Sequence, residues 1–221
     1  MSRLDYKTAA AYVLISCLAF FLIFYHLGDR LMWGDELTTA LLAVNINKFG
    51  LPKVSDEKNV ITYIGEEIDA DKYGNWIWSP WLAEYLAAAS FKLFGQSTAA
   101  ARMPFAIIGF LSVALIAFAA YRIYGSHEIA LMSMLFLAAS EAFVLHARQC
   151  RYYSLVIFAA IVLILGVCLL LKGRRAGGIT LLATALTIQF YTNYIVVAGS
   201  LAALFILAVV VYKRYDKLWR S

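Results

Sequence analysis

Long uncharged, apolar stretches alternate with short charged segments along the chain. No Asp, Glu, Lys or Arg lies between Thr8 and Gly28. A helix rises about 1.5 Å per residue and the hydrocarbon core is about 30 Å thick, so this stretch is long enough to span a membrane. Three further stretches have the same character, the second of them interrupted only by Glu141: 103–121, 129–147 and 152–171. The pattern predicts a transmembrane helix at each.

The last uncharged stretch, 176–212, is too long for one span. As a single helix it would reach about 55 Å, nearly twice the hydrocarbon core. It must fold back, and the polar cluster from Gln189 to Tyr194 marks the turn. We therefore predict one transmembrane domain over residues 1–221, with six spans near 8–28, 103–121, 129–147, 152–171, 176–191 and 194–212.

Composition supports the same fold class. The chain is 63% hydrophobic and 15% charged, with a mean hydropathy of +0.75, whereas soluble domains average about 45–50% and about 25%. These values exclude a soluble domain, a disordered chain and a coiled coil. The net charge of +5 does not indicate nucleic-acid binding in such a chain, because the position of each charge matters more than the sum. We expect an all-α membrane protein.

The basic residues are distributed asymmetrically about the predicted spans. Six spans place both termini on one side, where the short segments carry ten basic residues: Arg3, Lys7, Arg122, Lys172, Arg174, Arg175, Lys213, Arg214, Lys217 and Arg220. The opposite short turns carry only Arg148 and Arg151. The positive-inside rule then places both termini in the cytoplasm. We expect a bacterial inner membrane protein whose long loop, 29–101, is extracytoplasmic.

That loop is predicted to lie along the membrane surface. It holds four of the five tryptophans, a residue that favours the headgroup level. Helical spacing of apolar residues predicts amphipathic interfacial helices over 37–49 and 81–94, each followed by a glycine. The polar stretch between them, 53–75, reads as a mobile or partly ordered loop.

Trp33-Gly34-Asp35-Glu36 directly follows the first span and is the sharpest candidate for chemistry. One interpretation makes Asp35 only the N-cap of the helix that begins near Glu36. The other makes it a carboxylate at the lipid–water boundary that takes a proton from a hydroxyl acceptor. Both roles are compatible. The adjacent carboxylates also leave open a divalent cation, although two such groups are a weak metal signal.

Arg148 and Arg151 form a second candidate, in the outer turn before the span at 152–171. They are either snorkelling anchors or, as an i, i+3 pair beside tyrosines, a grip for an anionic headgroup or phosphate. Glu141 lies seven residues before Arg148 and so on the same helical face. An ionisable residue within a span is a functional candidate, and its expected role is to orient an arginine or a polar network between helices.

The topology brings several such groups to one membrane face. Asp35, Arg102, Arg148, Arg151 and Tyr194 all meet there, the last within Tyr191-Thr192-Asn193-Tyr194, whose tyrosines could equally be plain interface aromatics. A carboxylate, guanidiniums and aromatic rings at one boundary suit a lipid phosphate that carries a sugar. The three cysteines support neither pairing nor a metal site.

The order of the sequence blocks resembles the GT-C class of membrane glycosyltransferases, and most closely the protein O-mannosyltransferase and aminoarabinose lipid A transferase group. The blocks are Trp33–Glu36, Ser79–Leu86 with Leu93–Gly95, Ala101–Pro104, Ala147–Leu155 and Tyr191–Tyr194. The resemblance covers the whole chain but only the amino-terminal half of a typical member. Ser79 and Asn193 stand where the family often has a basic residue or a histidine.

The resemblance implies sugar transfer from a polyprenyl-phosphate donor to an acceptor at the outer face. It implies that Asp35 is the general base, with Glu36 as its neighbour, and that Arg148 and Arg151 stabilise the departing phosphate. Arg102 joins them by its position. Tyr152 and Tyr194 would line the donor pocket, with Asn193 and Glu141 in orienting roles.

A non-catalytic reading stays open beside the enzyme. The short chain would then be a GT-C-like subunit that packs within a larger membrane complex, with other membrane subunits as partners. A flippase or transporter is disfavoured, because no paired, broken spans indicate an inverted repeat.

Overall fold

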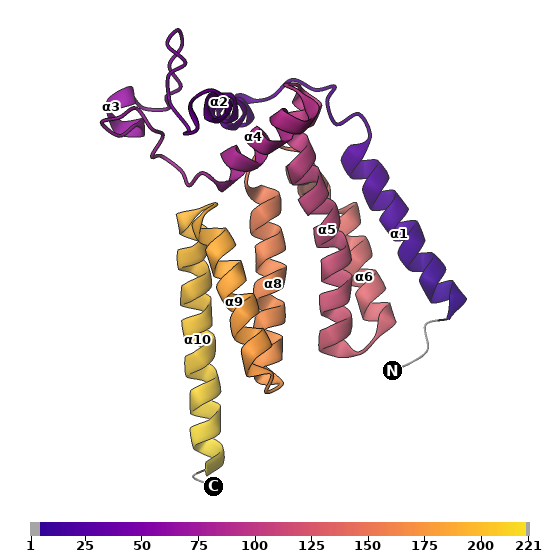
Figure 1. Ribbon diagram of the computed structural model, residues 1–221. Coiled ribbons are helices and arrows are strands. Elements are labelled where there is room, and N and C mark those ends of the chain that lie inside the picture. Colours follow the sequence, from indigo (N-terminus) through magenta and orange to yellow (C-terminus); the bar gives the residue numbers. More distant parts are fainter. Residues whose placement is uncertain (1–4, 220–221) are drawn as a thin grey trace.

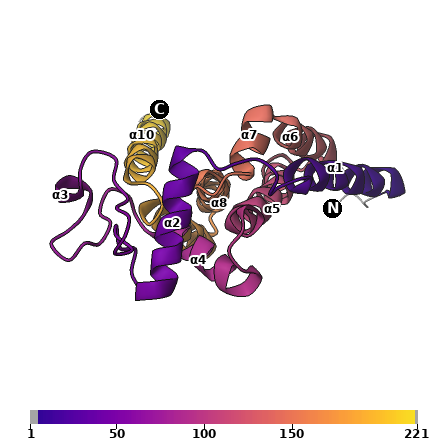
Figure 2. The same ribbon diagram turned by 90° about the horizontal axis from the view of Figure 1, so that it is seen from above.

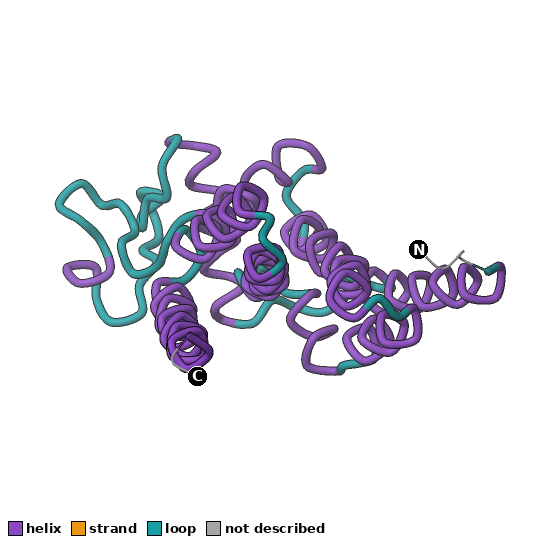
Figure 3. Tube along the Cα trace, turned by 90° about the horizontal axis from the view of Figure 1, so that it is seen from below, coloured by secondary structure: helices purple, strands orange, loops and turns teal. Residues whose placement is uncertain are grey.

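The computed structural model describes residues 5–219, and in that part of the chain it contains ten helices and no strand (Figures 1 and 3). The helices are α1 (Tyr6–Phe24), α2 (Gly34–Phe49), α3 (Glu66–Asp69), α4 (Leu82–Phe94), α5 (Thr98–Tyr124), α6 (His127–Ala139), α7 (Glu141–Ala147), α8 (Tyr153–Leu171), α9 (Arg175–Phe190) and α10 (Tyr194–Trp219).

Four helices are long and apolar enough to cross a membrane: α1, α5, α8 and the first 18 residues of α10. A fifth span results if the bent pair α6 and α7 is counted as one. The predicted all-α membrane protein is thereby confirmed. The predicted span at 176–191 corresponds to α9, which at 16 residues is shorter than the roughly 20 residues that a perpendicular span needs.

The predicted span at 129–147 is not one straight helix. It breaks at Ser140 into α6 and α7, which are bent by 66°. Ser140 serves both pieces, because its N–H bonds to the carbonyl of Leu137 and its Oγ accepts from the N–H of Phe143. A serine that caps the following helix competes with continuation of the preceding one. Residues on both sides of the break, Ala139 and Glu141, line the charged pocket described below.

The long helices stand side by side in a row. α5 packs against α1 and α6 on one side and against α8 on the other, α9 runs back along α8, and α10 contacts α9 (Figure 1). The α8–α9 contact is close because Gly166 and Gly178 face the partner helix, where an added Cβ would meet backbone at 3.0 Å and 2.9 Å. Small residues allow this approach in membrane helices.

The loop from 29 to 101 covers one end of this row. α2 and α4 pack on each other across the ends of the long helices (Figures 1 and 2), and α4 leads into α5. Both ends of the described chain lie on the opposite side of the bundle (Figure 1). Of the ten basic residues counted toward the cytoplasm, Arg3 and Arg220 lie outside the described residues. Buried side chains of α2, α4 and α5 form a core with Cys150 and Leu155.

The polar stretch 53–75, predicted as a mobile or partly ordered loop, is held together by hydrogen bonds to its own carboxylates. Asp69 is fully buried, and its Oδ2 accepts from the Thr62 hydroxyl and the Tyr63 and Ile64 N–H groups at 2.5 to 2.9 Å. Asp71 caps its own turn in the same way by accepting from the Asn75 N–H. Local side-chain bonds of this kind satisfy a backbone that has no sheet ladder.

Candidate active site at the end of the helix bundle

The site begins with the first turn of α2. The sequence interpretation of Asp35 as N-cap is wrong, because the helix starts at Gly34 and its N-cap is Trp33, which makes no side-chain cap bond. Asp35 and Glu36 therefore both lie inside the first turn, at the positive end of the helix dipole. Since neighbouring helical residues point about 100° apart, the two carboxylates face different partners.

Glu36 is buried against Arg102 of α5. The guanidinium donates from Nε to Oε1 and from Nη2 to Oε2, both at 2.8 Å. The Glu36 side chain is 1% exposed and that of Arg102 is 7%. Glu36 Oε1 also accepts from the N–H of Cys150 at 2.7 Å. This bidentate pair joins α2, α5 and the turn before α8, and such pairs are strong because both charges are bonded.

Arg102 has no donor left for a substrate. Its other N–H groups bond to three carbonyls of the segment that follows α1, those of Leu27, Arg30 and Leu31, at 2.9 to 3.2 Å. A guanidinium has five N–H donors, and all five are used. The expectation that Arg102 binds donor phosphate and that Glu36 takes part in the chemistry is therefore corrected. The pair holds the frame of the site.

Asp35 occupies the accessible side of the same turn. Its Oδ2 accepts from Nη2 of Arg151 at 3.1 Å, and its Oδ1 accepts from the hydroxyl of Tyr63 at 3.2 Å. Nη1 of Arg151 reaches the Asp35 carbonyl and the Thr39 hydroxyl. The Asp35 side chain is 32% exposed, against 11% for Arg151. Each carboxylate oxygen thus has one donor, and solvent reaches the group.

Tyr63 is a site residue that the sequence does not reveal. The Asp69 bonds fix its backbone, and its ring meets those of Trp76 and Trp78 at centroid distances of 5.5 and 6.0 Å. Partial burial raises the pKa of the Tyr63 phenol, so it stays a hydrogen-bond donor to Asp35. No motif marks such a residue, because it reaches the site only through the fold of its loop.

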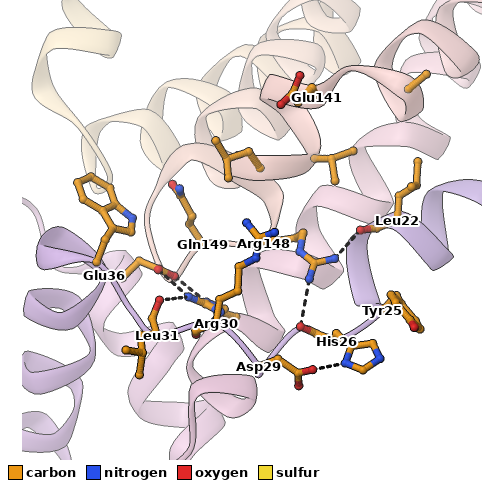
Figure 4. Close-up of a pocket in the computed structure, with 15 residues that line it drawn as sticks. Leu22, Tyr25, His26, Asp29, Arg30, Leu31, Glu36, Glu141, Arg148 and Gln149 are labelled. Carbon is orange, nitrogen blue, oxygen red and sulfur yellow. Dashed lines mark hydrogen bonds and ion pairs between the residues drawn. The ribbon is translucent and has the colours of Figure 1, made fainter.

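Arg148 lies apart from Asp35, in a pocket of about 780 Å³ between the end of α1 and the α6–α7 break (Figure 4). It donates to the carbonyl oxygens of Leu22 at 2.7 Å and His26 at 3.1 Å. These carbonyls lie at and just beyond the carboxyl end of α1, where a cation is favoured. His26 adopts a φ of +52°, which is uncommon for a residue with a side chain.

Glu141 also lines this pocket but does not orient Arg148 as expected. Among the described residues no hydrogen bond or ion pair joins Glu141 to an arginine, and Figure 4 shows its carboxylate apart from the Arg148 guanidinium. Arg148 takes its orientation from the α1 carbonyls instead. The candidate cation site at Asp35 and Glu36 does not form either, because the two carboxylates have separate partners.

A second, aromatic cleft of about 260 Å³ holds Tyr194. It lies between the end of the loop and the α9–α10 turn, and its lining residues are Trp76, Ile77, Ser79, Pro80, Trp81, Phe190, Tyr191 and Tyr194. Through Trp76 it adjoins Tyr63 and so Asp35. The guanidinium carbon of Arg151 lies over the ring of Tyr152, 5.1 Å from the ring centroid. Asn193 caps α10 by accepting from the Ile195 N–H and lines neither hollow.

Glu84 of α4 is a further buried carboxyl that sequence reasoning missed. It is 3% exposed, and its Oε2 has no hydrogen-bond partner among the described residues. Burial raises the pKa of Glu84 to about 7, against which the charge of Arg151 acts. A helical pattern cannot show this, because Glu84 at the start of an interfacial helix looks like an ordinary first-turn acid.

Comparison with known families agrees with this architecture. The family model of the dolichyl-phosphate-mannose-protein mannosyltransferases matches residues 79–220. The chain belongs to this family. Membership confirms the GT-C class resemblance and implies a membrane glycosyltransferase with a polyprenyl-phosphate sugar donor. The match includes Arg148 and Arg151, whereas Asp35 lies before it. No curated protein and no solved structure gives a significant match.

Proposed function

We propose that this protein transfers a sugar from a polyprenyl-phosphate donor to a hydroxyl acceptor at the outer face of the membrane, with Asp35 as the general base. The observation that carries the proposal is the setting of Asp35: a partly exposed carboxylate with one fixed donor on each oxygen. Because both donors come from ordered elements, the carboxylate is preorganised for proton transfer.

The reaction needs one proton acceptor and one stabilised leaving group. Asp35 takes the proton of the acceptor hydroxyl while the acceptor oxygen bonds to the anomeric carbon of the sugar. The bond from that carbon to the phosphate oxygen breaks, and its electron pair leaves with the polyprenyl phosphate. The extra negative charge on the phosphate is where fixed cations lower the barrier most.

We assign different roles to the two arginines, Arg151 and Arg148. Arg151 is committed to Asp35 and Thr39, so we assign it to positioning the base. Arg148 spends only two of its five N–H donors on carbonyls and faces the larger pocket, so we assign it to the donor phosphate. This separation refines the expectation that both bind phosphate.

The aromatic cleft completes the arrangement. A transfer requires two substrates, and the two hollows described above adjoin the first turn of α2 or its Tyr63 contact. Phosphate chemistry belongs to the hollow with guanidiniums. We therefore assign the aromatic cleft with Tyr194 to the acceptor, whose apolar surface it can cover, and Tyr152 to support of Arg151.

The test uses the purified full chain in liposomes with a radiolabelled polyprenyl-phosphate mannose, the sugar named in the family description. Membranes of the producing organism supply acceptors. The proposal expects release of polyprenyl phosphate and label on an acceptor, both lost in Asp35→Asn. Donor that stays intact with the purified chain, together with a stoichiometric complex with other membrane proteins, would favour the non-catalytic subunit.

A further inference from the structure

Two guanidiniums, those of Arg30 and Arg148, approach each other in the charged pocket. Figure 4 shows the side chain of Arg30, from the segment after α1, reaching toward that of Arg148. Among the described residues the Arg30 side chain makes no hydrogen bond and no ion pair. The bonds of the Arg148 side chain to other described residues are those to the carbonyl oxygens of Leu22 and His26.

The acidic groups of the pocket leave these two arginines unmatched. Glu36 is occupied by Arg102 on both oxygens. Asp29 bonds to the ring of His26, and its charge raises the pKa of Arg148 less than burial and the nearby arginines lower it. Figure 4 shows the Glu141 carboxylate apart from the Arg148 guanidinium. Within the part of the chain that the structure describes, no carboxylate is bonded to Arg30 or Arg148.

The electrostatics of Arg148 show the effect of this crowding. Burial lowers the pKa of Arg148, and the charges of Arg102 and Arg30 lower it further. Like charges brought together in a partly buried hollow repel, and a bound anion relieves that repulsion. Planar guanidiniums match phosphate oxygens particularly well, because they can donate two parallel hydrogen bonds.

The walls of the pocket are those of a site for an amphiphile. Apolar side chains from the end of α1, the following segment and the α6–α7 pair line it beside the arginines: Leu22, Leu31, Trp33, Ala139, Val144 and Leu145. α1 is a candidate span, and α6 with α7 is the bent one. A ligand that enters here can keep a chain in the bilayer while its head reaches the arginines.

We propose that Arg30 and Arg148 together bind the phosphoryl head of a membrane lipid in this pocket. This deepens the proposed function, because the polyprenyl-phosphate donor is such a lipid. Arg30 is then a binding residue that the sequence analysis did not identify.

The experiment measures binding, not transfer, so that its failure is distinct from failure of the proposed reaction. The purified full chain in a zwitterionic detergent is titrated with undecaprenyl phosphate, and the shift in thermal unfolding and the bound mass in native mass spectrometry are followed. Undecaprenol, phosphatidylglycerol and inorganic phosphate are run in parallel. The variants are Arg30→Gln and Arg30→Glu, with Arg122→Gln as the matched control, an exposed arginine at the other end of α5.

The proposal expects undecaprenyl phosphate to stabilise the protein and undecaprenol to do so far less. Arg30→Gln should weaken binding about tenfold or more, the loss of about 1.4 kcal/mol, and Arg30→Glu should abolish it. Without lipid, both variants should unfold at or above the wild-type temperature, because they remove repulsion and break no bond. Equal binding of phosphatidylglycerol with the same Arg30 dependence would support a site for lipid phosphate in general.

Three results would overturn the proposal: unchanged lipid affinity in the Arg30 variants, equal loss in Arg122→Gln, or binding of inorganic phosphate with no gain from a lipid chain. Destabilisation of the lipid-free protein by Arg30→Gln would also overturn it, since that result assigns Arg30 a structural role. None of these results depends on whether Asp35 is the general base.

Discussion

The buried pair of Glu36 and Arg102 allows a quantitative test of what holds the site in place. Met has a side chain close in length to that of Arg but carries no charge. Replacing Arg102 by Met therefore leaves Glu36, which is 1% exposed, with the Cys150 N–H as its remaining partner. It also frees three carbonyls after α1. Breaking one side of a buried ion pair costs about 3–5 kcal/mol, so Arg102→Met should destabilise the protein by at least that much.

The assay is unfolding of the purified protein in increasing SDS mole fraction, followed by tryptophan fluorescence. Arg122→Met is the control, because Arg122 is exposed on the same helix, and its loss should cost less than about 1 kcal/mol. In the double variant Glu36→Gln, Arg102→Met the stranded charge is gone. Its cost should therefore fall below the sum of the two single costs, with a coupling energy of about 1–3 kcal/mol.

The reasoning would be refuted if Arg102→Met unfolded like Arg122→Met, or if the two single costs added without coupling. Either result would mean that Arg102 does not hold the helices of the site together. Its guanidinium would then be available to a substrate, as the sequence alone suggests.

Three further predictions concern the loop and the second buried acid. Tyr63→Phe keeps the ring but removes the bond to Asp35, so sugar transfer should fall about tenfold at unchanged stability, whereas Tyr73→Phe, a more exposed tyrosine of the same loop, should transfer normally. Burial alone would raise the pKa of Asp69, but its hydrogen bonds lower it below the ordinary 3.8. The ionised Asp69 therefore contributes its full stability above pH 3.8, and this contribution is lost as the pH falls through the lower pKa of the folded state. Thermal unfolding of Asp69→Asn, followed against pH, should lack this loss at acid pH. For Glu84 the folded pKa of about 7 exceeds the ordinary 4.5, so stability should fall as pH rises from 4.5 to 7. Glu84→Gln should remove this pH dependence and unfold at a higher temperature than wild type at pH 8. The same pH dependence in variant and wild type would contradict the burial of Glu84.

The long helices follow from the sequence because uncharged stretches of about 20 residues have few other uses. The bend at Ser140 does not, since the apolar pattern continues through it and only the capping bond of one serine decides the break. The start of α2 is missed for a related reason: Trp33 takes an extended backbone without a side-chain cap, so no capping residue announces it.

The site was predictable in its location but not in its pairings. Topology brings Asp35, Arg102 and Arg151 to one end of the bundle, yet the choice of partner depends on which way each side chain points. A one-residue difference along α2 separates the accessible Asp35 from the buried Glu36. Tyr63 was not predicted because its loop has no hydrophobic periodicity, and the loop is held by the hydrogen bonds of one buried carboxylate, that of Asp69.

The central claim is that adjacent carboxylates do different work, Asp35 in the chemistry and Glu36 in the frame. The most direct measurement compares Asp35→Asn with Glu36→Gln, recording for each the rate of sugar transfer from the polyprenyl-phosphate donor and the free energy of unfolding. The account predicts that Asp35→Asn loses at least a hundredfold in rate and keeps near wild-type stability, while Glu36→Gln loses stability first. Full transfer by Asp35→Asn in a folded protein would contradict it.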